Sequence, residues 1–164
     1  MKLTFGVTDI PYAANGKIPP KVAQAKKGKA NKPLEKTAGE EKAVSTGDVA
    51  EWLESEYHVM ETFARMNEEN IAKYLENSLA GSLENTMMGA PPAANPYAGA
   101  ESAIEDRFKQ FLLLNEIEGS GIPGVPTTAA MKGVNHRLKS GKGSPRPSFI
   151  DTGLYESSFV AKVE

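Results

Sequence analysis

Residues 48–88 read DVAEWLESEYHVMETFARMNEENIAKYLENSLAGSLENTMM, and this stretch decides the fold. Its apolar residues recur at the three- and four-residue spacing of an amphipathic helix, along the series Leu53, Tyr57, Met60, Ala64, Ile71 and Tyr74, with polar Asn67 in the row. Asp48 and Glu51 form a capping-box pattern, and no glycine or proline follows before Gly81. The pattern therefore predicts one continuous helix from Asp48 to about residue 80, or at the longest to Met88.

A helix of this length has a consequence for packing. At 1.5 Å per residue it spans roughly 50 Å, which exceeds the width of a small domain. It therefore needs a second helix along its apolar side, from its own chain or from a neighbouring subunit. Trp52 and Phe63 lie on that side, and we expect both to anchor the helix in the core.

Alternating patterns stand at both ends of the chain. In residues 2–8, one face of the predicted strand carries Leu3, Phe5 and Val7. In residues 155–163, one face carries Phe159, Ala161 and Val163. We expect these segments to form strands that pair in a small antiparallel sheet.

Shorter helices are predicted between the long helix and the last strand. The run Gly89–Pro92 ends the first helix, and residues 89–100 read as a linker. Ser102 and Glu105 form a second capping box, which starts a helix that ends near Gly119. Thr127 or Thr128 caps a third helix through Leu138. The predicted fold class is α+β, with helices packed on a small antiparallel sheet in a single domain, residues 1–164.

Charge is segregated along the chain. Residues 17–36 hold seven lysines and one acid, residues 48–85 hold nine acids and two bases, and residues 131–146 hold five bases and no acid. Residues 13–44 show no periodicity, and we expect them to form an extended or disordered basic arm. The lysines that carry it are Lys21, Lys26, Lys27, Lys29 and Lys32. Such an arm serves either as a solvated linker or as a contact for a partner.

Composition excludes several classes of function. The 164 residues include no cysteine, which rules out disulfides, thiol catalysis and cysteine-ligated zinc. A net charge of −2 rules out a uniformly basic nucleic-acid binder. No apolar run is long enough for a membrane span and no signal-peptide pattern is present, so we expect neither insertion nor export. His58 and His136 lack a nucleophile or second ligand at helical spacing, so we expect no enzyme, no metal and no cofactor.

The tripeptide Asp151-Thr152-Gly153 follows the apolar pair Phe149-Ile150 and matches the active-site turn of retroviral-type aspartic proteases. Only 11 residues follow Gly153, too few for the strands and flap of a substrate cleft. The tripeptide is better explained as a turn in which glycine supplies a positive φ. A protease would lose its activity on Asp151→Asn, whereas a turn would tolerate that change.

The segment that contains this turn, PRPSFIDTGLYESSFV at residues 145–160, resembles the C-terminal segment of neck and tail-completion proteins of tailed bacteriophages. Thr152 and Gly153 match the turn of that family, and Ser158 and Phe159 match the start of the strand after it. Tyr155 stands where the family usually has leucine, and Glu156 where it often has arginine.

The resemblance implies a non-enzymatic virion protein that forms a homo-oligomeric ring, commonly a hexamer, in the neck, after assembly in the host cytoplasm. Its implied partners are the head connector or adaptor and the tail tube or tail terminator, and DNA passes through without specific binding. The assembly candidates are then Asp151, Thr152, Gly153, Tyr155, Ser158 and Phe159. The alternative function is a small DNA-binding or DNA-packaging accessory protein whose lysine-rich arm contacts phosphates.

Overall fold

The computed structural model describes residues 2–11, 44–133, 143–150 and 153–164. The predicted basic arm, residues 13–44, lies outside the described residues except for Val44. Asp151, Thr152 and His136 also lie outside them. The predictions on these residues are neither confirmed nor contradicted.

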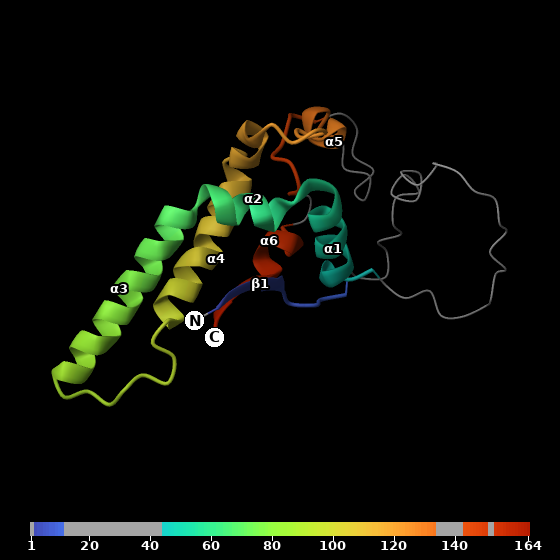
Figure 1. The fold of residues 1–164 in the computed structure, drawn as a ribbon. Helices are drawn as coiled ribbons and strands as arrows, with labels where there is room; N and C mark the ends of the chain where they lie inside the picture. The colour runs from blue at the N-terminus through green and yellow to red at the C-terminus, as the bar shows by residue number, and fades with distance from the viewer. Residues whose placement is uncertain (1, 12–43, 134–142, 151–152) are drawn as a thin grey trace, which may run out of the picture.

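The two ends of the chain form a two-stranded antiparallel sheet, as the alternating patterns predict. β1 (Leu3–Val7) pairs with β2 (Phe159–Val163), and Leu3 lies opposite Val163. The helical elements are α1 (Thr46–Tyr57), α2 (Val59–Met66), α3 (Glu68–Met87), α4 (Ala98–Leu113), η2 (Glu116–Ser120), α5 (Thr128–Met131) and α6 (Leu154–Ser158). The α+β class, with helices packed on a small terminal sheet, is confirmed (Figure 1).

The predicted continuous helix is wrong, because the stretch forms three helices. His58 has φ 48° and ends α1, and Asn67 separates α2 from α3. A left-handed residue other than glycine costs roughly 1–2 kcal/mol. Burial offsets this cost, since the redirected α2 places Val59 and Phe63 in the core. The periodicity survives both breaks, which is why the sequence alone does not show them.

The start of the first helix also differs from the prediction. Ser45, not Asp48, is the N-cap residue: its hydroxyl accepts a hydrogen bond from the Asp48 N–H, and the Asp48 carboxylate accepts one from the Ser45 N–H. Asp48 is therefore the third residue of the helix and the reciprocal partner of the capping box. The Ser102 and Glu105 pair is not a cap, because α4 begins at Ala98, and the helix ends at Leu113 rather than near Gly119.

Two further elements differ in extent. Thr127 caps α5 as predicted, and its hydroxyl accepts a hydrogen bond from the Ala130 N–H. The described part of that helix ends at Met131, short of the predicted Leu138. Residues 154–158 form the short helix α6 instead of the first half of the last strand. The predicted buried face of that strand is correct for Phe159 and Ala161.

The core is an aromatic cluster centred on Phe63, which is fully buried. Its ring contacts Phe5 of β1, Phe159 of β2, and Phe108 and Phe111 of α4, with ring centroids 5.1 to 6.0 Å apart. Edge-to-face pairs at these distances are favourable beyond the area that they bury. One residue of α2 therefore joins both strands to the second long helix.

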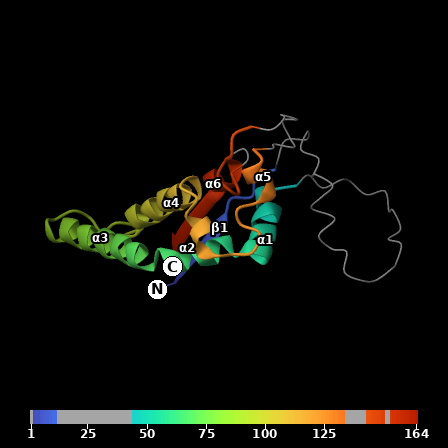
Figure 2. The ribbon, with the colours of Figure 1, turned by 90° about the horizontal axis from the view of Figure 1, so that it is seen from above.

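The helices α3 and α4 form an antiparallel hairpin that projects away from α1, and α4 packs against β2 (Figures 1 and 2). Ile71, Tyr74 and Leu75 lie on the side of α3 that faces the core cluster. The far half of α3 extends beyond that cluster. Within the described residues, no helix is long and apolar enough to cross a membrane.

The different burial of Phe63 and Trp52 gives a stability prediction. Phe63 is fully buried, whereas Trp52 is only partly buried at the margin of the cluster. We expect Phe63→Ala to lower the free energy of unfolding by about 3–5 kcal/mol, the range for a buried aromatic. Trp52→Ala, the matched control, removes a larger ring and yet should cost less. Urea unfolding checks this, and equal losses for the two variants would contradict the packing.

Candidate functional site

The residues predicted for assembly lie at the start of the C-terminal segment. Gly153 has φ 74° and immediately precedes α6, so the positive φ expected of the turn is confirmed. Tyr155, Ser158 and Phe159 follow it, and all three are buried within the chain itself. Their part in assembly stays a prediction. Because their side chains are buried, these residues would contribute to assembly by positioning the backbone and not by contacting a partner directly.

These buried side chains fix the C-terminal segment on α4 and β1. The ring of Phe159 stacks on that of Phe108, with centroids 3.9 Å apart, and Tyr155 meets the same ring edge-on. The Ser158 hydroxyl donates to the Tyr155 carbonyl, and the Ser158 carbonyl accepts from the Thr8 N–H at 2.7 Å. The direction of β2 is thus set before the strand begins.

One edge of the sheet is closed by side chains of α4. The Ala161 N–H donates to the Glu105 carboxylate at 3.3 Å, and the Val163 N–H donates to the Glu101 carboxylate at 2.9 Å. Sequence reasoning missed this role and assigned Glu105 to a helix cap. The spacing of Glu101 and Glu105 is a signal for it, because residues four apart lie on one helix face and can contact the same strand.

The other edge of the sheet, on β1, is open. Lys2 and Glu164 exchange both backbone hydrogen bonds, and Thr8 donates to Ser158. Because antiparallel pairs alternate, the backbone groups of Leu3, Phe5 and Val7 point away from β2. No hydrogen bond to these groups is found within the described part of the chain. An unpaired edge of this kind is a template for a strand from another chain.

A second exposed surface lies on the outer side of α3. Leu79, Leu83 and Met87 follow one another four residues apart, and they are 46%, 60% and 80% exposed. Glu76 and Glu84 are exposed on the same outer side. We call these five residues the α3 face. A row of large apolar side chains in water indicates an interaction site more often than chance exposure does.

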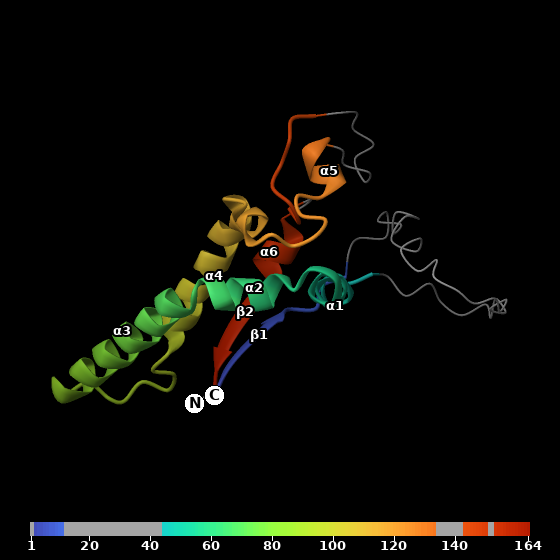
Figure 3. The same cartoon turned by 45° about the horizontal axis from the view of Figure 1, so that its top comes forward.

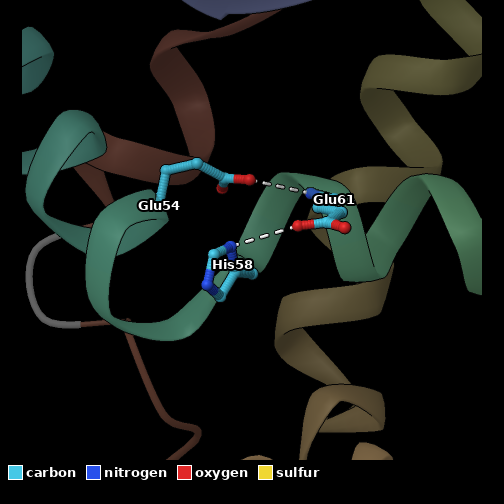
Figure 4. A group of neighbouring side chains, drawn as sticks. All are labelled: Glu54, His58 and Glu61. Carbon is cyan, nitrogen blue, oxygen red and sulfur yellow. Dashed lines mark hydrogen bonds and ion pairs between the residues drawn. The ribbon is translucent and has the colours of Figure 1, made fainter.

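A third cluster stands at the break between α1 and α2, where Glu54, His58 and Glu61 converge (Figure 4). The Glu54 carboxylate accepts from the Met60 N–H at 2.8 Å and the Glu61 N–H at 3.1 Å, so it caps α2. His58 Nδ1 lies 3.1 Å from the Glu61 carboxylate. The three groups offer ligand atoms within 4.8 Å of one another, a set that suits a divalent cation. Their contacts are those of a helix joint, and we assign them that role.

Polar contacts also fasten the segment before the turn to η2 and its cap, and η2 to α4. Ser148 is buried; its N–H donates to the Asn115 side chain and its hydroxyl donates to Glu118. Arg107 and Glu116 form a two-bonded ion pair at 2.6 and 2.9 Å. The hydrogen bonds to Glu116 raise the pKa of Arg107, and burial opposes the rise.

Glu156, which stands where the phage proteins of the resemblance often have arginine, is partly buried in α6. Desolvation raises the pKa of its carboxyl group, and the charge of Lys109 opposes the rise. An arginine here would meet Lys109 as a like charge. A glutamate at this position therefore avoids a like charge beside Lys109.

Comparison of the chain with family models, with curated proteins and with solved structures finds no match. Function is therefore inferred from the surfaces described above and from the resemblance of residues 145–160.

The turn before α6 gives a second prediction. A side chain at Gly153 must adopt the left-handed backbone, and its Cβ would lie 3.1 Å from the Glu156 carboxylate. We expect Gly153→Val to destabilise the fold by roughly 1–2 kcal/mol. Gly153→Asn is the matched control, because asparagine tolerates a positive φ, and it should cost less. Thermal unfolding distinguishes the two, and a harmless valine would contradict the turn assignment.

Proposed function

We propose that this protein is a non-enzymatic structural subunit of a phage virion, which assembles into a ring at the neck and joins the head connector to the tail. The observation that carries the proposal is the asymmetry of the terminal sheet. Glutamates of α4 close one edge, and on the other edge the backbone groups of Leu3, Phe5 and Val7 have no hydrogen-bond partner among the described residues.

An open edge supports assembly because it binds a strand through main-chain hydrogen bonds, with little demand on side chains. Natural monomeric proteins protect such edges with charges, prolines or bulges. β1 has no proline and no acid, and Lys2 is the charged residue beside it. A neighbouring copy that lays an extended segment along β1 would satisfy the free groups.

A closed ring needs two different surfaces on each subunit, so that every copy offers one and accepts the other. The β1 edge and the α3 face are both accepting surfaces, and they differ in element and in chemistry. The offered surface is an extended segment of the neighbouring copy. The resemblance of residues 145–160 to phage neck proteins supports the place of the ring in the virion. It also supports a function without a catalytic step.

The edge can be blocked without disturbing the sheet. Proline at positions 3 and 7 removes two outward N–H groups that do not pair with β2. We expect the Leu3→Pro, Val7→Pro double variant to fold and yet to lose the ring, which light scattering and negative-stain electron microscopy would show. The control is Leu3→Ala with Val7→Ala, which loses the same side chains and keeps both N–H groups.

Two results would count against this proposal. A proline variant that assembles as fully as the alanine control would remove the β1 edge from the assembly. A native chain that stays monomeric at every concentration, or that is missing from the head–tail junction of particles probed with an antibody against it, would contradict the ring and its location.

A further inference from the structure

We infer that the α3 face is a docking surface for the lysine-rich segment, residues 17–36, of a second copy of this chain. This inference rests on the proposed function and specifies one contact between neighbours in the ring. It begins with the α3 face itself, which no other described element covers. Leu79, Leu83 and Met87 stand in a row there, beside the carboxylates of Glu76 and Glu84.

The carboxylates of this face form no ion pair with a described residue, although Lys73 stands three residues before Glu76 on the same helix. No ion pair involving α3 is found among the described residues. Those residues together hold eight lysines and arginines and seventeen aspartates and glutamates, a net charge of −9. The balancing positive charge belongs to the rest of the chain, and residues 17–36 hold the largest share, with seven lysines and one acid.

The segment matches the face in both charge and apolar content. Its lysines alternate with the aliphatic residues Ile18, Val22 and Leu34. Aliphatic side chains can cover the row on α3 while lysines reach the flanking glutamates with their long stems. Such electrostatic complementarity fixes partner and register more than it adds affinity.

The occupant is a second copy because of where the segment is anchored. The described residues on either side of positions 12–43 meet at one point, since Pro11 and Ser45 form a β-bridge and the Thr46 N–H donates to the Ile10 carbonyl at 2.9 Å. This point lies beside α1, and α3 runs away from it (Figures 1 and 3). Residues 12–43 leave this point and return to it, so the segment can extend outward by at most half of their length, about 50 Å.

A neighbour placed head to tail brings its α3 to the anchor instead. Each subunit then donates its lysine-rich segment and accepts a neighbour's segment on its α3 face. Because these are different surfaces of one subunit, the contacts can repeat from copy to copy and close a ring. The face spans about 17 Å along α3, from Glu76 to Met87, so an extended segment of this size is long enough to follow it.

Cross-linking tests the contact directly, because the chain has no cysteine. One tagged copy carries Lys27→Cys and a differently tagged copy carries Leu83→Cys, and mild oxidation traps neighbouring thiols. We expect disulfide-linked pairs between the two tags, and far fewer in 1 M salt, where screening is strong. The matched control, Ser102→Cys, places an exposed thiol on α4 and should yield few pairs.

Charge reversal provides the second arm of the test. Glu76→Lys with Glu84→Lys should reduce the cross-linked fraction about tenfold, because two attractive contacts become repulsive. Glu51→Lys with Glu56→Lys changes the charge by the same amount on α1 and should leave the fraction unchanged. Cross-linking at Ser102 as strong as at Leu83, or no effect of the α3 reversal, would overturn the docking surface.

The remaining outcomes distinguish the alternatives. Linkage only within a single chain that carries both cysteines would show self-docking and overturn the second copy. Duplex DNA that abolishes the cross-link and binds with a steep salt dependence would assign the lysines to phosphates instead. If rings form and the Leu83 cross-link does not, the docking contact is refuted and the ring is not. If cross-linked pairs form and closed rings do not, the ring is refuted and the docking contact is not.

Discussion

The aromatic ring of Phe63 touches β1, β2 and α4 at once, through Phe5, Phe159, Phe108 and Phe111. Only a short helix that crosses the end of the hairpin can present one side chain to all three elements. The breaks at His58 and Asn67 create that helix. Glu54 stabilises the first break by accepting two N–H groups of α2, and Asn67 contributes at the second by donating to the Phe63 carbonyl.

Once Phe63 has joined the two ends of the chain, the properties of the sheet follow. β2 packs on α4, so Glu101 and Glu105 reach its outer N–H groups. Among the described residues, no helix forms hydrogen bonds with the outer edge of β1. The same packing leaves the far half of α3 outside the core. An open strand edge and an exposed helix face are therefore products of one folding constraint.

Local patterns predict much of this fold and fail where tertiary contacts override them. The alternation of Leu3, Phe5 and Val7 predicts β1, and Gly153 predicts the turn with positive φ. The break at His58 carries no local signal, since neither glycine nor proline is near. Burial of Phe63 outweighs the cost of the strained residue there. Local sequence patterns also do not predict that glutamates close the edge of β2. The two hydrogen bonds join residues that are 56 and 62 positions apart in the chain.

Assembly should pair the free edge of β1, and the proposed ring depends on this pairing. Amide hydrogen exchange on the full chain, at concentrations below and above assembly, measures it residue by residue. We predict that Thr4 and Gly6, which face β2, are protected in both states, and that Leu3, Phe5 and Val7 gain protection only in the assembled state. Equal and rapid exchange of these three amides in monomer and assembly would contradict the pairing.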